Sequence, residues 1–131
     1  MGLSIYFSKV NKRDYSLNQK TAINDEIEIC YFRDVYCLLP FFDYAYNQEY
    51  LEIERSQIVS LLKTVKNLLA IYNKLETSKF AKIAEEELPS LVEIYDYDDY
   101  VIDLQDIEND FEKILEETDF ENEQVLMYCW W

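Results

Sequence analysis

The residues best suited to chemistry in this sequence are acids and tyrosines, and they gather in the segment 93–100 (EIYDYDDY). This segment holds four acids and three tyrosines in eight residues. In an extended chain, side chains on one face recur about every 6.6 Å, which would place Asp96, Asp98 and Tyr100 together. Such a row suits a basic nucleic-acid-binding groove, where carboxylates compete with phosphates and tyrosine rings compete with stacked bases. The alternative is an acidic surface loop whose tyrosines fold back onto the core.

A second group of acids belongs to a helix predicted over residues 103–118. Its apolar residues recur at helical spacing, so the acids between them should face outward, and Asp103 suits the N-cap. Like charges on one helix face repel each other and lower the stability of the fold. Because the fold tolerates this loss of stability, a function that involves a basic partner is favoured. Solubility is the alternative explanation. The predicted partner-binding residues are Glu93, Tyr95, Asp96, Tyr97, Asp98, Asp99, Tyr100, Asp106, Asp110 and Glu117.

The formal net charge is −15, and its distribution is uneven. Residues 83–131 hold seventeen acids and one lysine, whereas residues 1–82 are nearly balanced. The segment 55–82 has six basic residues and one acid, which predicts a solvated helix face that also offsets acids elsewhere in the fold. The excess of acid disfavours direct DNA binding. Contact with RNA is expected only where the partner is a ribonucleoprotein.

Most catalytic and metal-binding chemistry has no support in this composition. The sequence contains no histidine, which removes the commonest general base and zinc ligand. Counted from Asp96, an EF-hand loop fails because Val101 and Ile107 stand where Gly and Glu are required. We therefore predict no cofactor, no bound metal and no enzymatic activity. A carboxylate–magnesium enzyme remains a third alternative.

The expected compartment follows from the cysteines and from the hydropathy pattern. The three cysteines (residues 30, 37 and 129) match no zinc motif, and we expect them to be reduced and mostly buried. Residues 1–10 lack the apolar core of a signal peptide, and no stretch reaches the roughly 20 apolar residues of a membrane span. We expect a cytoplasmic protein with no membrane contact.

The hydrophobic periodicity predicts an α+β fold in one domain, residues 1–131. Alternating residues predict a strand over 3–10, and an apolar, aromatic and β-prone run predicts a second strand over 124–131. The two strands should pair and bury part of the C-terminal tryptophan pair. Residues 11–22 read as a loop, and residues 23–29 as an edge strand or a helix lead-in. Four helices are expected over 30–46, 55–76, 78–88 and 103–118, with a kink at Pro40, a cap at Ser56 and a stop at Pro89.

The predicted helix over 30–46 is dense in aromatic residues. Its phenylalanines are expected in the core, while some of its tyrosines suit a protein interface. The tyrosines at issue are Tyr31, Tyr36, Tyr44 and Tyr46.

Four short blocks, taken in order, carry a family resemblance. They are the opening MGLSIYF, the segment EICYFR at 28–33, the stretch YDDY leading into LQDIE at 97–108, and the closing YCWW. The chain resembles small uncharacterised phage and prophage proteins that open with MGLDMY and finish with a terminal tryptophan. Ser4 stands where that pattern has Asp, and SLVEIY replaces its Gly- and Phe-rich segment. The resemblance implies a mobile-element origin and a bacterial host cytoplasm, and small acidic phage proteins often inhibit host nucleic-acid enzymes.

These observations predict a protein-binding inhibitor of a host defence nuclease, of the anti-CRISPR type. It would occupy a basic nucleic-acid-binding surface, with fast and salt-sensitive association. The main alternative is a structural or accessory phage protein that self-associates through its aromatic surface and has no inhibitory role.

Overall fold

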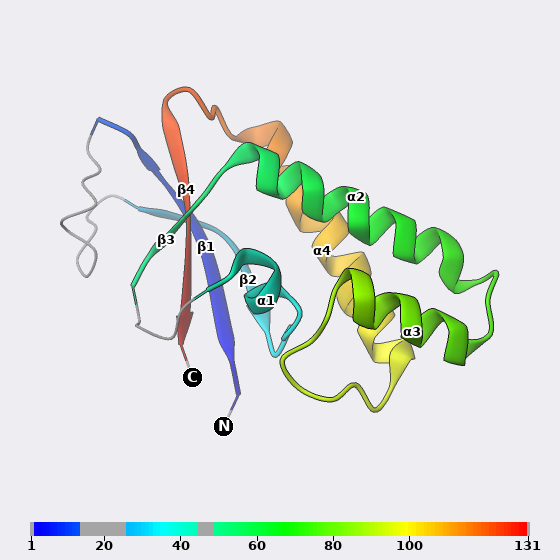
Figure 1. The fold of residues 1–131 in the computed structure, drawn as a ribbon. Coiled ribbons are helices and arrows are strands. Elements are labelled where there is room, and N and C mark those ends of the chain that lie inside the picture. The colour runs from blue at the N-terminus through cyan, green and yellow to red at the C-terminus, as the bar shows by residue number, and fades with distance from the viewer. Residues whose placement is uncertain (1, 14–25, 45–48, 131) are drawn as a thin grey trace.

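The computed structural model describes residues 2–13, 26–44 and 49–130 of the chain. Helices and strands follow in the order shown in Figure 1. They are β1 (Ser4–Asn11), β2 (Ile27–Arg33), α1 (Leu38–Phe42), β3 (Leu51–Ile53), α2 (Arg55–Tyr72), α3 (Thr77–Glu87), α4 (Tyr97–Glu117) and β4 (Glu123–Trp130).

The strands form one antiparallel sheet in the order β2-β1-β4-β3. The first and last strands pair along their whole length, from Ser4 opposite Trp130 to Asn11 opposite Glu123. This confirms the α+β class and the predicted pairing of the terminal strands. Trp130 remains 53% exposed at the end of its strand, and Trp131 lies outside the described residues.

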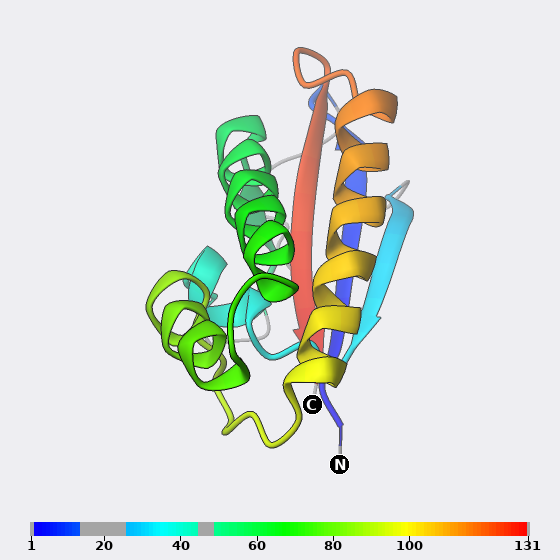
Figure 2. The ribbon, with the colours of Figure 1, turned by 90° about the vertical axis from the view of Figure 1, so that its right-hand side faces the viewer.

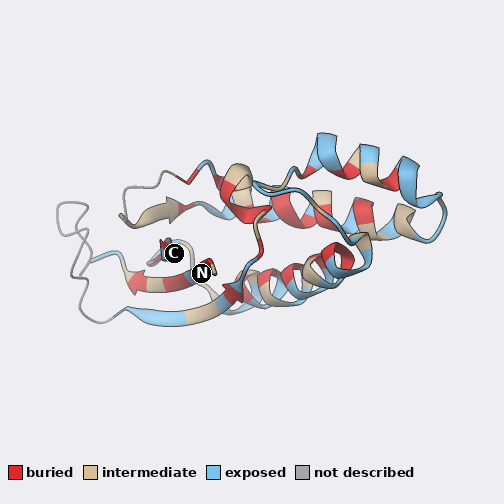
Figure 3. Cartoon of the chain, turned by 90° about the horizontal axis from the view of Figure 1, so that it is seen from below, coloured by how far each residue is buried: buried red, intermediate tan, exposed pale blue. Residues whose placement is uncertain are grey.

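Helices α2 and α4 lie side by side on one face of the sheet (Figures 1 and 2). Strand side chains alternate between the two faces. Most residues of β1 and β4 are buried, as the red colouring of Figure 3 shows. Phe111 of α4 is fully buried at the centre of this core. Its ring centroid lies 5.0 Å from that of Phe7 and 5.8 Å from that of Phe32. The core therefore ties α4 directly to β1 and β2.

The predicted helix over 30–46 is wrong. Residues 30–33 belong to β2, where Cys30 and Phe32 stand opposite core residues of β1 and Tyr31 stands opposite exposed Tyr6. Only α1 is helical in this region, and Pro40 sits in its first turn, where no backbone N–H is needed. Residues 45 and 46 of the predicted helix lie outside the described residues, as do residues 14–22 of the predicted loop.

The remaining boundaries show two further corrections. The backbone N–H of Glu54, the N-cap of α2, donates to Oε1 of Gln57 at 2.7 Å, so Ser56 is not the cap. Helix α4 begins at Tyr97, six residues before the predicted start, with Asp96 as its N-cap. Asp103 therefore lies inside the helix. The edge-strand alternative for residues 23–29 holds for 27–29, and residues 23–25 are outside the described part. Strand β3 was not predicted.

Candidate functional site

The segment 93–100 is not extended, so its side chains do not form the predicted row. The carboxylate of Asp96 accepts a hydrogen bond from the backbone N–H of Asp98 at 2.9 Å and caps α4. Asp98 in turn accepts a hydrogen bond from the Tyr72 hydroxyl of α2. Both carboxylates have local partners, and helical geometry turns Asp98 away from Tyr100. These acids hold the start of α4 in place.

Of the three tyrosines predicted to bind a partner, only Tyr95 has a largely exposed side chain. Tyr95 is 89% exposed, whereas Tyr100 is 5% exposed. Tyr97 and Tyr100 both pack edge-on against Phe80 of α3, with centroids 5.9 and 6.3 Å from its ring. Burial raises the pKa of the Tyr100 hydroxyl, which donates to the carbonyl of Leu88 at 3.0 Å. Tyr97 and Tyr100 thus join α3 to α4.

Five of the nine acids of α4 form a row along one side of the helix, with Lys113 between Asp110 and Glu117. Residues separated by 4, 7, 11 and 18 positions share a side of an α-helix. We call this row the acidic stripe, and it consists of Asp99, Asp103, Asp106, Asp110 and Glu117. Four of its five members were among the predicted site residues. Asp103 was missed because it was assigned as the helix cap, although its spacing from Asp99 and Asp106 was a sufficient signal.

The acidic stripe lies on the side of α4 next to β2, as the electrostatic contacts show. The carboxylate of Asp110 helps to raise the pKa of the Cys30 thiol on β2, after burial as the main cause. Asp34, which directly follows β2, helps to raise the pKa of Asp103. Figure 2 shows α4 with β2 on one side and α2 on the other. The stripe therefore forms a negative surface along one edge of the helical layer.

Two members of the stripe ionise with difficulty. Burial raises the pKa of Asp103 from its ordinary value of 3.8 to about 6, and nearby Asp106, Asp99 and Asp34 add to the shift. Burial and Asp106 also raise the pKa of Asp110, against the opposing effect of Lys113. Because burial and then neighbouring carboxylates oppose the ionisation of Asp103 and Asp110, the stripe carries an electrostatic cost in the free protein.

The opposite side of α4 has a basic partner from α2. The Nζ of Lys66 lies 2.5 Å from Oε1 of Glu112, and Glu112 and then Glu108 raise the pKa of this lysine. The predicted offsetting of acids by the basic segment is therefore seen on this side. The free negative charge of α4 is concentrated in the stripe.

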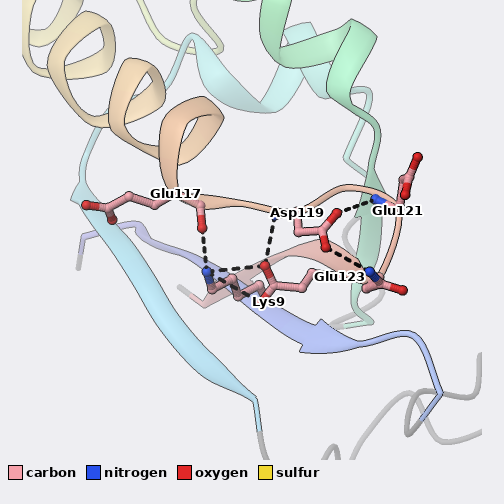
Figure 4. Close-up of polar contacts among 6 residues, drawn as sticks. Lys9, Glu117, Asp119, Glu121 and Glu123 are labelled. Carbon is pink, nitrogen blue, oxygen red and sulfur yellow. Dashed lines mark hydrogen bonds and ion pairs between the residues drawn. The ribbon is translucent and has the colours of Figure 1, made fainter.

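At the C-terminal end of α4, acids and carbonyls build a turn. Lys9 Nζ donates to the carbonyl of Glu117 at 3.0 Å and lies 3.5 Å from the Glu123 carboxylate (Figure 4). Asp119 accepts hydrogen bonds from the backbone N–H of Glu121 at 3.2 Å and from the Asn122 amide at 2.8 Å. These bonds lower the pKa of Asp119. The acids of this turn orient β4 and leave the side chain of Glu117 exposed.

At the other end of the stripe lies a hollow of about 250 Å³. It is bounded by the β2–α1 connection, the loop from α3 to α4, and the first turns of α4. Its rim is acidic, and its wall is apolar and aromatic. The rim acids are Asp34, Glu93, Asp96, Asp99 and Asp103, and the wall includes Tyr36, Val92, Ile94, Tyr95 and Tyr100. Five of the ten predicted site residues line this hollow: Glu93, Tyr95, Asp96, Asp99 and Tyr100.

The aromatic residues of 30–46 divide between the core and a second surface. Phe32 and Phe42 are buried as predicted. Tyr44 is buried and donates to the carbonyl of Glu49 at 2.9 Å. Tyr31 is 43% exposed on the sheet face away from the helices, with its ring centroid 5.1 Å from that of Tyr6. Tyr46 lies outside the described residues.

Among the described residues, no group of three or more acids or cysteines is arranged to hold a metal ion. All three cysteines are free thiols, and burial raises the pKa of Cys37 and Cys129 to about 12. None of the helices in the described part is both long and apolar enough to cross a membrane.

Comparison of this chain with protein-family models, curated proteins and solved structures finds no match.

Proposed function

We propose that this protein is an acidic inhibitor that binds the basic nucleic-acid-binding surface of a host defence nuclease. The acidic stripe is the observation that carries this proposal. The resemblance to small phage proteins supplies the setting, a phage protein acting in the bacterial cytoplasm. The proposed partner is a CRISPR effector or another nuclease with a comparable basic channel, and the stripe would occupy that channel.

The charge density of α4 supports competition with nucleic acid. The helix carries nine carboxylate residues among its twenty-one. Five of them form the acidic stripe, which spans 18 residues or about 27 Å at a rise of 1.5 Å per residue, so its carboxylates recur about every 7 Å, against about 3.4 Å for the phosphates of one DNA strand. Lysines and arginines that bind a phosphate row therefore meet a row of negative charge at about half that linear density. The proposal also explains why this row of acids is tolerated when Lys113 is the one basic residue of α4.

The same charge opposes direct DNA binding by the protein itself. RNA contact is proposed only within a ribonucleoprotein partner, where the basic segment 55–82 is the part suited to it. One of its lysines, Lys66, already pairs with Glu112, which reduces the positive charge available on α2.

The experiment is a DNA-cleavage assay on a panel of purified RNA-guided nucleases. The stripe variant carries Asp106→Lys and Glu117→Lys, both exposed positions outside the hollow. The control variant carries Glu86→Lys and Glu87→Lys on α3, which are exposed and change the net charge equally. We expect wild type and the control variant to inhibit at least one nuclease and the stripe variant to lose inhibition. Equal inhibition by both variants would reject an electrostatic contact through α4.

Self-association is the second candidate function, and the outer face of the sheet favours it. Tyr6, Tyr31 and Trp130 are 37%, 43% and 53% exposed there. Light scattering of wild type and Tyr31→Ser separates the two functions. A stable oligomer that dissociates on this substitution supports self-association, and a monomer in both cases rejects it. A carboxylate–magnesium enzyme has no supporting observation among the described residues.

A further inference from the structure

The hollow at the N-terminal end of α4 combines features that charge alone does not explain. Its wall contains the rings of Tyr36 and Tyr95 and the side chains of Val92 and Ile94. Val92 is 46% exposed and its neighbour Leu91 is 43% exposed, so apolar surface faces solvent next to the acidic rim. A ligand matched to this hollow needs an apolar body and a cationic end.

One rim carboxylate is fixed in place before any ligand binds. Oδ1 of Asp34 accepts hydrogen bonds from the backbone N–H of Leu3 at 2.6 Å and from the Tyr36 hydroxyl at 3.2 Å. Its backbone adopts the left-handed conformation with φ of 57°, which Asp tolerates better than most residues. Its Oδ2 also lies 3.7 Å from Nε of Arg33, so Asp34 holds a defined position on the rim and part of its charge is offset.

The rim acids on α4 complete a negative pocket. Asp99 and Asp103 are one helical turn apart and line the hollow, and both Asp99 and Asp34 act electrostatically on Asp103. A cation placed between them would relieve this mutual repulsion. The charge of the hollow thus complements a basic group, and its wall complements the aliphatic and planar parts of one.

We propose that the hollow receives an arginine side chain from the basic partner. The inference rests on the proposed function and names the chemistry of its anchoring contact. A guanidinium is planar, is weakly hydrated, stacks on aromatic rings and binds carboxylates with two donors at once. A lysine ammonium is a compact and strongly hydrated charge that gains less from an aromatic wall. The exposed Val92, which lines the hollow, would contact the aliphatic part of the arginine.

The probes are fluorescein-labelled nona-arginine and nona-lysine peptides, measured by fluorescence anisotropy in about 50 mM NaCl, where screening is weak. Two variants test the hollow, Asp103→Asn on the rim and Val92→Ser on the wall. Their controls are Glu86→Gln and Val59→Ser, because Glu86 is exposed and Val59 is 40% exposed, both outside the hollow.

We expect nona-arginine to bind about threefold or more tightly than nona-lysine, and each hollow variant to weaken nona-arginine binding by about threefold, the scale of one partly exposed charge pair. The controls should bind as wild type does. Amide shifts in an NMR titration should centre on residues 91–103. Equal affinity for the two peptides would overturn the preference for arginine. Unchanged affinity in both hollow variants would overturn the site.

The nuclease assay separates this inference from the proposed function. Hollow variants that inhibit as well as wild type, while the stripe variant does not, would reject the hollow and keep the function. Binding of nona-arginine in the hollow with no nuclease inhibited would keep the hollow and reject the function.

Discussion

The hydroxyl of Tyr100 donates a hydrogen bond to the carbonyl oxygen of Leu88, 3.0 Å away, and joins the first turn of α4 to the end of α3. Both residues are buried, so the carbonyl has no access to bulk water in place of the hydroxyl. The loop between them carries Val92 and Tyr95, which line the hollow. This hydrogen bond therefore helps to set the shape of the hollow.

Removing the Tyr100 hydroxyl tests how much this hydrogen bond between α4 and the end of α3 contributes to stability. Tyr100→Phe should lower the free energy of unfolding by about 1–2 kcal/mol, because the carbonyl of Leu88 loses its buried donor. Urea denaturation followed by circular dichroism gives the value. Tyr95→Phe is the matched control, since Tyr95 is 89% exposed, and it should leave stability unchanged. Equal stability of Tyr100→Phe and wild type would show that the hydrogen bond contributes nothing.

Asp103 should destabilise the free protein at neutral pH. Its pKa is about 6 in the fold against 3.8 ordinarily, so the folded state holds a proton that the unfolded chain has lost between these values. Stability from this group is therefore highest below pH 4 and falls as pH rises to 6. Asp103→Asn should raise the free energy of unfolding at pH 7.5 by about 1 kcal/mol after allowance for solvent screening.

The pH series distinguishes this electrostatic cause from better packing. Denaturant unfolding of wild type and Asp103→Asn at pH 3.5 and 7.5 should show the difference only at the higher pH. A gain of equal size at both values would contradict the raised pKa. A variant that folds more stably but binds arginine more weakly would place Asp103 in a binding role.

Phe111 should be the most costly residue of α4 to truncate. It is fully buried, and its ring packs against those of Phe7, Phe32 and Phe42. Phe111→Ala should cost about 3–5 kcal/mol, through lost burial and the cavity left behind. Ile102 on the same helix is 53% exposed. The substitution Ile102→Ala should therefore change the free energy of unfolding by less than about 0.5 kcal/mol. Similar losses in the two variants would contradict the assigned core.

The cysteines should resist alkylation in the folded protein. Burial raises the pKa of Cys37 and Cys129 to about 12 and also raises that of Cys30. At pH 8, a thiol with this pKa is ionised in roughly one molecule in ten thousand, and only the thiolate reacts. Mass spectrometry after iodoacetamide treatment should find three labelled cysteines in denaturant and almost none without it. Rapid labelling of any one in the native protein would be inconsistent with this burial.

The elements that the sequence predicts well are those with a long, unambiguous period. Helix α2 has an apolar residue at nearly every core-facing position of its 18 residues. Strand β1 begins with alternating residues, and β4 is a β-prone apolar run. The segment 30–46 fails because strand and helix share it. Four residues of β2 and five of α1 together imitate one continuous helical pattern, and short apolar runs fit both periods.

The predicted start of α4 at Asp103 is too late because the acids and tyrosines of 93–100 resemble a surface segment more than the first turn of a helix. Tyr97, Tyr100, Val101 and Leu104 continue the apolar stripe of the helix, and Asp98 and Asp99 suit the positive end of its dipole. The acidic stripe could therefore have been predicted from the sequence alone. The hollow was not, because it requires Asp34 of the β2–α1 connection to meet α4, and no local pattern encodes that contact.

The most direct test of the central claim is displacement of fluorescently labelled double-stranded DNA from a nuclease that the protein inhibits. Wild type and the Glu86→Lys/Glu87→Lys control should displace the DNA at similar concentrations, and less effectively as salt rises. The Asp106→Lys/Glu117→Lys stripe variant should leave it bound. Displacement by the stripe variant at the wild-type concentration, or displacement that ignores salt, would contradict an acidic α4 that competes with nucleic acid.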